Sequence, residues 1–357
     1  MPQVVRFEAP YRVRLADVPP RAPGSGEVRV RTLFSGISAG TELTAYRGTN
    51  PYVSAEWDAA SALFHPRDVG APGGRSGSAS GGYPLEGWGY SEVGKVVQVG
   101  PDCPDPVSVG DVVWGIWGHR SEAVLAAATL SRQILPAGVA PEVGCFARVG
   151  SVALNAVLAA ECGIGSTVVV LGQGVIGLLA TAFASRSGAR VVAVDRIAAR
   201  RDRALRFGAD AALAPGPEVA GDLREQTDGL GADVVIELSG SDAALHEATR
   251  IAGPEAMVVA AGFYQGPAGA LRLGEEFHHN RVELVCSQIG GVPPALAGRW
   301  DADRLNRTFL SLAAQRAVDP VALVTHRVPA AHAAQAYEVL DQRPTEALQI
   351  VLDYTEE

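Results

Sequence analysis

The feature that most constrains the fold is a glycine-rich turn in the middle of the chain. An apolar, mostly β-branched run at 167–171 (TVVVL) is followed at once by Gly172-Gln173-Gly174-Val175-Ile176-Gly177 and then by an apolar helical pattern. Because these glycines interrupt the apolar stretch at 166–185, a strand, a tight turn and a helix explain it better than a membrane span. The sequence therefore predicts a βα unit with its turn at Gly172.

Similar units follow along the chain. Further apolar runs occur at 190–194, 233–237, 256–261 and 282–286, with helical segments such as 175–187 and 197–207 between them. Short apolar runs that alternate with helices are typical of a parallel sheet covered on both faces. We therefore expect an α/β fold with a doubly wound Rossmann sheet at 151–290.

The first 150 residues follow a different pattern. Short alternating runs at 28–33, 93–99, 111–114 and 121–125 are separated by Gly and Pro clusters, which favours an antiparallel, barrel-like domain. The tail contains helical stretches at 301–315 and 330–341 and an apolar strand at 347–353. We expect it to return to the barrel, so that residues 1–150 and 291–357 form one domain into which 151–290 is inserted.

Between the barrel strands, residues 48–87 are long and irregular. The segment 70–82 (GAPGGRSGSASGG) is flexible by composition, and both a lid and a disordered insertion are consistent with it.

Charge and cysteine usage exclude several classes of protein. The chain has 357 residues and a formal net charge of −9, which argues against a nucleic-acid or anionic-membrane partner. Lys95 is the only lysine, so any Schiff-base chemistry depends on it. The N-terminus lacks the features of a secretory signal, and the four cysteines form no CxxC pair. We expect a cytoplasmic protein without a disulfide framework.

The central turn also has the spacing of a dinucleotide-binding fingerprint. In a GxGxxG between strand and helix, the glycines make the turn, admit a pyrophosphate and allow close packing, and the phosphates lie at the helix N-terminus. Asp195, 18 residues past Gly177, ends the strand at 190–194, where a carboxylate accepts ribose hydroxyls and repels a 2′-phosphate. NAD is therefore expected over NADP, although Arg196 softens that repulsion. A purely structural βα turn and a flavin site are the alternatives. The expected cofactor contacts are Gly172, Gly174, Val175, Ile176, Gly177, Asp195, Arg196, Ser239, Gly262 and Ser287.

Over essentially its full length, the chain resembles the medium-chain dehydrogenase/reductase superfamily, in the branch of zinc alcohol, polyol and threonine dehydrogenases. The order of barrel, central GxGxxG and return segment carries the resemblance, together with 277–280 (FHHN), 287–290 (SQIG) and 325–328 (THRV). It implies a GroES-like catalytic domain, a small-molecule substrate and a homo-oligomer, either a dimer or a tetramer.

The zinc-binding segments of that branch are altered here. By the resemblance, Ser38 in 36–42 (GISAGTE) stands for a Cys, Tyr90 and Ser91 in 89–94 (GYSEVG) for a His-Glu pair, and Arg148 for a Glu. Ser, Tyr and Arg do not make a zinc site, and a cation repels the metal. The four-Cys structural lobe is missing as well. We therefore expect a zinc-free member that holds no metal.

Without zinc, the reaction needs another acid or base and another stabiliser of charge on oxygen. Tyr90 is a candidate donor, although it could merely fill the volume of the metal. His119 is a candidate proton shuttle or, alternatively, a surface loop residue. Thr41 matches the family's hydroxyl relay, and Ser38 is positioned to contact substrate. The expected substrate-binding residues are Glu42, Arg148 and Asn155, with Glu42 or a substrate anion pairing with Arg148.

These features together predict an NAD-dependent, zinc-independent dehydrogenase. Its expected substrate is a secondary alcohol or ketone of a sugar, cyclitol or amino sugar, as the polyol-dehydrogenase resemblance implies. The Gly-Ile-Ser and Gly-Tyr departures also resemble bacteriochlorophyllide dehydrogenases, so a larger substrate stays open. The alternatives are a zinc-free NADPH quinone or enoyl reductase and a non-catalytic NAD-binding protein.

Overall fold

The structure is a computed structural model that describes residues 1–53, 55–66, 82–103 and 107–355. The chain divides into two compact units, the first made of Met1–Ala147 and Val321–Glu357 and the second of Arg148–Pro320. The second unit is therefore an insertion in the first. Each unit is described by itself below.

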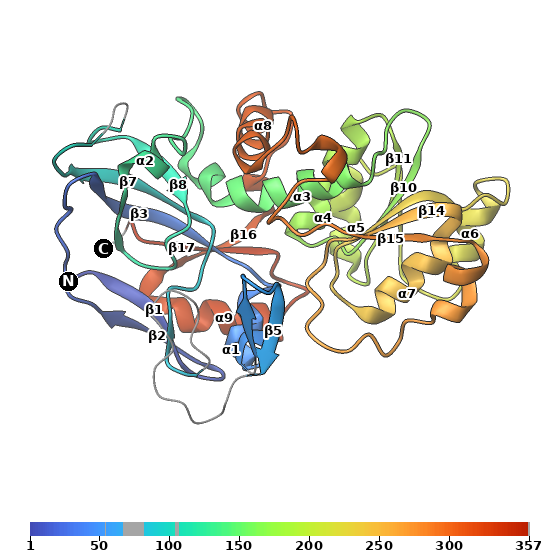
Figure 1. Cartoon of the computed structure of the whole chain (residues 1–357), viewed down its shortest axis with the longest axis horizontal. Helices are drawn as coiled ribbons and strands as arrows, with labels where there is room; N and C mark the ends of the chain where they lie inside the picture. The colour runs from blue at the N-terminus through green and yellow to red at the C-terminus, as the bar shows by residue number, and fades with distance from the viewer. Residues whose placement is uncertain (54, 67–81, 104–106, 356–357) are drawn as a thin grey trace. The chain divides into compact units, whose positions relative to one another are not determined.

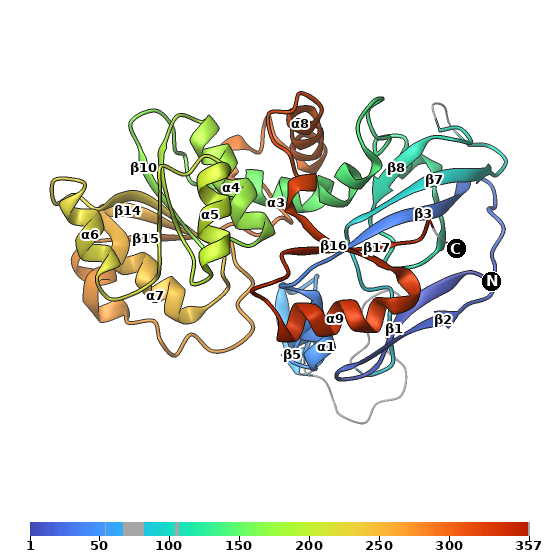
Figure 2. The same cartoon turned by 180° about the vertical axis from the view of Figure 1, so that it is seen from behind.

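The second unit is built on a six-stranded parallel sheet with the order β12-β11-β10-β13-β14-β15 (Figures 1 and 2). The strands are β10 (Thr167–Leu171), β11 (Arg190–Val194), β12 (Ala211–Leu213), β13 (Ala232–Glu237), β14 (Ala252–Ala260) and β15 (Glu283–Cys286). The helices are α3 (Ala147–Ala159), α4 (Val175–Arg186), α5 (Ala198–Arg206), α6 (Val219–Glu225), α7 (Asp242–Ile251) and α8 (Ala302–Ala314), with short turns η3 (Leu273–Phe277) and η4 (Pro294–Leu296).

The order of this sheet places the site. Right-handed crossovers put α4 and α5 on one face and α7 on the other, and the direction of winding reverses between β10 and β13. Doubly wound sheets bind ligands at the carboxyl ends of the strands next to such a reversal. Val168, Val169 and Val170 of β10 are fully buried, as the apolar run at 167–171 predicted.

Helix α8 belongs to this unit, whereas the sequence analysis placed residues 291–320 with the N-terminal domain. Asp301 caps the helix by accepting a hydrogen bond from Arg304 N at 2.7 Å. On its buried face, the Phe309 ring lies edge-on to Phe183 of α4, with 6.4 Å between centroids, and a Cβ on Gly150 of α3 would overlap that ring. The apolar face of α8 therefore packs against helices α3 and α4 of its own unit.

Within its described residues, the first unit contains two main sheets and one hairpin. The larger sheet has the order β16-β17-β3-β7-β8 with β9 also paired to β3, the smaller one the order β2-β1-β6, and β4 pairs with β5. The strands are β1 (Gln3–Ala9), β2 (Arg12–Asp17), β3 (Glu27–Ile37), β4 (Ala55–Asp58), β5 (Leu63–Pro66), β6 (Leu85–Glu86), β7 (Glu92–Val99), β8 (Val112–Gly115), β9 (Glu122–Ala126), β16 (Val324–Pro329) and β17 (Gln349–Asp353). The helices are α1 (Glu42–Arg47), α2 (Ala127–Leu130) and α9 (Ala333–Gln342), with turns η1 (Pro51–Val53), η2 (Pro141–Phe146), η5 (Val321–Leu323) and η6 (Ala330–His332).

The segment before β9 joins the two sheets. Val5 N of β1 donates to the carbonyl oxygen of His119 at 2.8 Å, and Thr32 N of β3 donates to that of Ser121 at 2.9 Å. His119 therefore lies inside a closed, barrel-like arrangement rather than on a surface loop. Helix α9, from the end of the chain, lies beside α1 in both views (Figures 1 and 2). Residues 321–355 belong to the first unit and contribute β16, α9 and β17 to it.

The irregular region at 48–87 contains the short hairpin of β4 and β5, which the sequence analysis did not predict. The proposed lid or insertion at 70–82 lies outside the described residues apart from Gly82. One helical stretch, Pro141–Ala159, is long and apolar enough to cross a membrane, but 78% of its most apolar window is buried within the structure. It has the burial expected of a core helix.

Candidate active site

The glycine-rich turn lies at the carboxyl end of β10, where the chain enters α4. Gly172 has a φ of +87°, and a Cβ there would stand 2.7 Å from the amide nitrogen of Ser239. A Cβ on Gly177 would overlap the carbonyl oxygen of Gly172. At Gly174, in contrast, nothing lies within 4 Å of an added Cβ. The turn is therefore packed on its protein side and open at Gly174, as a pyrophosphate approaching the helix N-terminus requires.

Asp195 follows β11 beside this turn, with 7% of its surface exposed. Its Oδ2 accepts a hydrogen bond from Gln173 N, and its Oδ1 accepts one from Ile197 N, both at 2.7 Å. Two main-chain N–H groups thus fix the carboxylate next to the turn, while each oxygen retains a further lone pair. Its placement and chemistry fit the hydroxyls of a nucleotide ribose.

Two arginines lie near this carboxylate. Arg196 is exposed, as expected for a residue that could approach a ribose substituent. Burial lowers the pKa of half-buried Arg200, and Asp195 opposes that effect. The local charge is therefore mixed, with the acidic group held closest to the turn.

The sequence analysis missed Glu237, which organises the next loop from the end of β13. Its carboxylate accepts hydrogen bonds from Ser239 N at 2.7 Å and Gly240 N at 3.2 Å, and from the hydroxyls of Ser239 and Tyr264. Burial raises the pKa of Glu237, and the bonds from Ser239 and Tyr264 oppose this. The only signal in the sequence was an acidic residue that ends an apolar run.

Glu237 also brings predicted cofactor contacts together. It pairs in register with Leu171, the residue before the glycine turn, so the Ser239 loop lies beside that turn. A Cβ on Gly262 would stand 2.5 Å from Gly240 N and 2.9 Å from Glu237 Oε2. Gly262 is therefore required for the close approach of the loops that follow β13 and β14.

Asn155 of α3, predicted as a substrate contact, and Ser287 after β15, predicted as a cofactor contact, lie together in the structure. Asn155 Nδ2 donates to Ser287 Oγ at 3.3 Å and to the Gly291 carbonyl oxygen at 3.1 Å. Asn155 is 1% exposed, and its Oδ1 has no hydrogen-bond partner within the described ranges of the chain. Buried acceptors are nearly always satisfied, so this atom is an exception that keeps Asn155 a candidate ligand contact.

In the first unit, the structure brings Ser38 and Tyr90 together. Ser38 lies in the turn between β3 and α1, Tyr90 precedes β7, and their hydroxyl oxygens are 2.6 Å apart. Thr41 N donates to Ser38 Oγ at 3.4 Å, which places the predicted hydroxyl relay in the same turn. All three residues are half-buried.

Behind this pair lies a buried cluster of ionisable side chains. His119 Nε2 donates to Glu42 Oε2 at 2.6 Å, and the Tyr337 hydroxyl donates to the same oxygen at 2.6 Å. His119 Nδ1 contacts Ser35 Oγ, whose hydroxyl donates to Glu92 Oε1 at 3.4 Å. Burial lowers the pKa of His119, but the Glu42 carboxylate outweighs burial and raises it. The cluster therefore favours an imidazolium between two carboxyl groups.

These positions change two predicted roles. His119 was expected to exchange protons with substrate and Glu42 to bind it, yet their exposures are 1% and 0%. Both are engaged within the first unit, so direct substrate contact is replaced by a supporting position. The sequence pattern alone does not show that the loop carrying His119 is enclosed by hydrogen bonds to β1 and β3. Arg148, by contrast, is half-buried at the start of the second unit.

The side chains at the expected zinc positions do not suit the metal. Structural and catalytic zinc takes Cys, His and carboxylate ligands, whereas Ser38, Tyr90 and Ser91 supply hydroxyls and Arg148 supplies a cation. Ser38 and Tyr90 also hydrogen-bond each other, so at least one hydroxyl keeps its proton. No cluster of three His, Cys, Asp or Glu suited to a metal occurs among the described residues.

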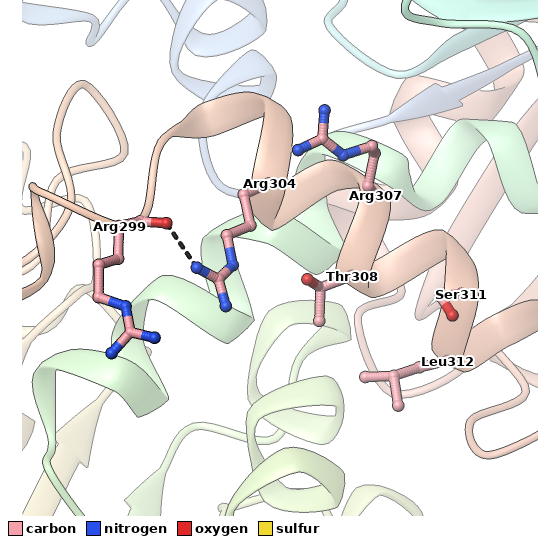
Figure 3. Close-up of a pocket in the computed structure, with 6 residues that line it drawn as sticks. All are labelled: Arg299, Arg304, Arg307, Thr308, Ser311 and Leu312. Carbon is pink, nitrogen blue, oxygen red and sulfur yellow. Dashed lines mark hydrogen bonds between the residues drawn. The ribbon is translucent and has the colours of Figure 1, made fainter.

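A separate pocket lies on α8 in the second unit and contains none of the predicted site residues (Figure 3). Its volume is about 610 Å³, and its lining consists of Arg299, Arg304, Arg307, Thr308, Ser311 and Leu312. Arg304 donates to the carbonyl oxygen of Arg299 at 2.6 Å and stacks 4.2 Å from the Trp300 ring centroid.

The parallel sheet, the glycine turn and the anchored Asp195 define a dinucleotide-dependent oxidoreductase. Comparison with known proteins agrees. Residues 175–297 match the family described as zinc-binding dehydrogenase. The chain is 31% identical to D-guloside 3-dehydrogenase of Shigella flexneri over 96% of this chain and 97% of that protein. It is 28% identical to L-threonine 3-dehydrogenase of Pyrococcus horikoshii, covering 74% and 77% of the two chains.

Among solved structures, the short chain alcohol dehydrogenase rspB of E. coli CFT073, complexed with NADH, shares the fold with a TM-score of 0.75 at 20% identity. The match covers 99% of both chains. The chain belongs to the zinc-type medium-chain dehydrogenase family, as its resemblance predicted. It is an NAD(P)-dependent oxidoreductase that acts on CH–OH groups, and the predicted α/β fold class is confirmed.

Proposed function

We propose that this protein is a zinc-independent, NAD-dependent dehydrogenase that interconverts a secondary alcohol and a ketone on a polar, polyol-like substrate. The observation that carries the proposal is the pair of Ser38 and Tyr90. Their hydroxyl oxygens lie 2.6 Å apart at two positions where the family places metal ligands. A phenol with an adjacent hydroxyl can do by proton transfer what zinc does by polarising oxygen.

The preference for NAD is supported by Asp195. Its carboxylate is anchored by two main-chain N–H groups and retains lone pairs for the 2′- and 3′-hydroxyls of a ribose. A 2′-phosphate would meet a fixed negative charge at the same place. Arg196 is exposed, so it can turn away into solvent instead of drawing a phosphate toward the site.

The second unit holds the other groups that would bind NAD. The first turn of α4 presents N–H groups beside the open side of Gly174, and the Ser239, Gly262 and Ser287 loops follow the central strands. The unpartnered Asn155 Oδ1 suits the amide N–H group of a nicotinamide. When bound, NAD supplies the acceptor for the hydride of the alcohol.

Residues of the first unit carry out the proton transfer. In ketone reduction, the Tyr90 hydroxyl donates its proton to the substrate oxygen as the hydride reaches the carbonyl carbon. Ser38 then stabilises the phenolate by donating its own hydroxyl proton into a hydrogen bond. In alcohol oxidation, the phenolate oxygen takes the hydroxyl proton while the hydride leaves the same carbon.

Substrate polarity is inferred from the relatives and from the side chains. The relative at 31% identity acts, by its name, on a guloside, in which the reacting alcohol is one hydroxyl among several. Ser38, Thr41 and Tyr90 offer matching donors and acceptors. A sugar, cyclitol or amino sugar therefore fits better than a simple alkanol.

We further propose a cytoplasmic homo-oligomer. Its support is β15 at the open edge of the parallel sheet, with Leu284 38% exposed and nearby Phe263 40% exposed. An apolar edge strand of this kind pairs readily with a second copy. Light scattering at several protein concentrations tests the assembly, and a monomer throughout would contradict it.

One assay tests the main proposal. Absorbance at 340 nm is followed with NAD or NADP across polyols, glycosides, quinones and enones, with and without a chelator, alongside a zinc determination. Oxidation of a polyol with NAD, insensitive to chelator and without stoichiometric zinc, is expected. Loss of activity with chelator would overturn zinc independence. Enone or quinone reduction with NADPH alone would favour a reductase, and cofactor binding without any turnover a non-catalytic role.

A further inference from the structure

A cluster of five buried side chains stands behind the Ser38 and Tyr90 pair, and the proposed chemistry does not use it. Ser35, Glu42, Glu92, His119 and Tyr337 are each at most 1% exposed. They come from β3, α1, β7, the segment before β9, and α9. Burying two carboxyl groups and an imidazole costs free energy of folding. Their presence in the interior therefore points to a functional role.

Glu42 is the centre of this cluster. Its Oε2 accepts hydrogen bonds from His119 Nε2 and the Tyr337 hydroxyl, both at 2.6 Å. Its Oε1 accepts from the main-chain nitrogen of Ser38 at 2.9 Å. In addition, Glu42 N donates to the Ser38 carbonyl oxygen at 3.0 Å. Glu42 therefore holds both main-chain polar groups of the residue whose side chain meets Tyr90.

The partners of Glu42 fix its own carboxylate. Tyr337 is fully buried and stacks on Tyr46 of α1, with 5.7 Å between ring centroids. His119 is bonded through both ring nitrogens and through its main chain to β1. Neither partner can move without disturbing a packed strand or helix. The turn at Ser38 is thus tied to three elements through one carboxylate.

We propose that Glu42 is a positioning residue for the proposed proton-transfer pair. With His119 and Tyr337, it locks the Ser38 main chain so that the Ser38 hydroxyl stays in hydrogen-bond contact with Tyr90. This inference rests on the proposed function, since it assigns Glu42 a task for that same pair. Glu42 does not touch substrate, and its effect passes through Ser38.

The test compares Glu42→Gln, which keeps the shape but exchanges one acceptor for a donor, with Tyr337→Phe, which removes one bond to the carboxylate. Glu86→Gln, at an exposed acidic residue of β6, is the matched control. The first readout needs no substrate: the NMR signal of a ¹³C-labelled Tyr90 ring, assigned with Tyr90→Phe. We expect this signal to shift in Glu42→Gln and, by less, in Tyr337→Phe. No shift in either folded variant would overturn the proposal.

The second readout is turnover. Glu42→Gln is expected to lower kcat by roughly 10- to 100-fold, the cost of a misplaced reacting group, with KM for NAD and NADH binding unchanged. In a Ser38→Ala background, Glu42→Gln should lower kcat little further, because Glu42 acts on the reaction by positioning Ser38. If the losses of kcat from Glu42→Gln and Ser38→Ala add in the double variant, Glu42 has a structural role instead. The same conclusion follows if Glu42→Gln weakens NADH binding as much as it lowers kcat. If Ser38→Ala and Tyr90→Phe keep wild-type kcat, the proposed function fails, whereas the NMR result still decides the positioning.

The arginine pocket on α8 carries a second, independent inference. Arg304, Arg307, Thr308 and Ser311 recur at the spacing of one helix face, opposite the buried Phe309. Figure 3 shows the side chains of Arg299 and Arg304 close together at one end of this face. Within the described part of the chain, neither Arg299 nor Arg307 makes an ion pair within 4 Å. Three arginines thus line one pocket in a chain whose net charge is −9.

We infer that this pocket binds a phosphate dianion, either free or as a phosphate monoester. Guanidinium groups match phosphate oxygens two at a time, and the hydroxyls of Thr308 and Ser311 supply neutral donors. The Arg299 carbonyl oxygen and the Trp300 ring fix the side chain of Arg304. Little side-chain conformational entropy is therefore lost when phosphate binds. Asp301 is engaged in capping α8 and does not neutralise the pocket through an ion pair with these arginines.

Calorimetric titration of the full chain with inorganic phosphate tests this site, in phosphate-free buffer with saturating NADH to fill the dinucleotide turn. We expect saturable binding that weakens at least 10-fold in an Arg304→Gln/Arg307→Gln double variant and is unchanged in Arg316→Gln, an exposed arginine beyond α8. Tighter binding of a polyol phosphate than of phosphate would assign the site to a phosphorylated substrate, and equal binding to the free anion. No binding, or equal binding by the double variant, would overturn the inference.

Discussion

The hydroxyl oxygen of Ser38 lies 2.6 Å from the phenolic oxygen of Tyr90, across the gap between the turn after β3 and the residues before β7. By the family resemblance, both residues are expected at positions of catalytic metal ligands. Two protic groups in hydrogen-bond contact can share and pass a proton, but they make a poor ligand set for zinc. The proposed proton transfer rests on this contact.

Replacing Tyr90 by Phe removes the proposed proton donor and leaves the ring. We expect kcat to fall by about 10²- to 10⁴-fold, the range of a positioned general acid or base, with NADH binding unchanged. Stopped-flow hydride transfer and NADH fluorescence titration measure the two effects. Ser38→Ala, which leaves the phenol but removes its partner, should lose less.

The control for this prediction is Tyr52→Phe, at an exposed tyrosine outside the site. It should retain wild-type kcat. A Tyr90→Phe variant as active as this control would show that Tyr90 only fills space.

Asp195 predicts the cofactor preference. Asp195→Ala should lower kcat/KM with NAD by about 10- to 100-fold, since hydrogen bonds to a charged group contribute about 1.5–3 kcal/mol, and should lower it less with NADP. Because Asp195 also anchors Gln173 N and Ile197 N, thermal stability has to be measured beside the kinetics. Asp202→Ala, on the exposed side of α5, is the control. If the ratio of kcat/KM with NAD to kcat/KM with NADP is unchanged, Asp195 does not take part in ribose recognition.

Substitutions at Gly174 and Gly177 distinguish the requirements of cofactor binding from those of fold stability. A Cβ on Gly177 would overlap the Gly172 carbonyl oxygen, so Gly177→Ala should both destabilise the second unit and abolish NADH binding. A Cβ on Gly174 meets nothing within 4 Å, so Gly174→Ala should keep the melting temperature and weaken NADH binding alone. Calorimetric unfolding and fluorescence titration distinguish the two. If Gly174→Ala binds NADH as tightly as wild type, the open side of the turn is not the pyrophosphate site.

The parts of the fold that sequence predicted are those fixed by short-range pattern. The run at 167–171, the glycine turn and the acid at 195 lie close in sequence, and β-branched periodicity and glycine sterics determine their local structure. The strands β10 and β11 have the predicted bounds. Asn155 and Ser287, 132 positions apart, were expected separately, and only the structure shows their contact.

What the sequence did not reveal depends on long-range packing. Glu42, His119 and Tyr337 are brought together by α1, the segment before β9, and α9, and no local pattern relates positions so far apart. The role of Glu237 was missed for the same reason, since its partner Tyr264 lies 27 positions away. A charged residue inside an apolar strand was the one available signal, as at Glu92 at the start of β7.

The buried cluster predicts how stability depends on pH. Burial lowers the pKa of His119, but Glu42 and then Glu92 outweigh it, so the pKa rises above 6.5. Burial raises the pKa of Glu92 above 4.5, against the effects of His119 and the Trp117 N–H group. A group whose pKa is higher in the folded state stabilises the fold below its unfolded pKa, and this stability is lost as pH rises through the folded pKa. His119 and Glu92 therefore both make the folded state less stable as pH rises.

We accordingly expect the free energy of unfolding to fall as pH rises from 6.5, with an earlier contribution from Glu92 beginning at 4.5. Urea unfolding at a series of pH values measures this, and differences from wild type cancel the remaining groups. His119→Gln should flatten the decline above 6.5, while the exposed His65→Gln should leave it as it is. Glu92→Gln should remove the earlier contribution and keep the fold at neutral pH, because an amide supplies the neutral form that burial favours. A wild-type slope above 6.5 in folded His119→Gln would mean that the imidazole is not charged in the native cluster, and that Glu42 is held by neutral hydrogen bonds alone.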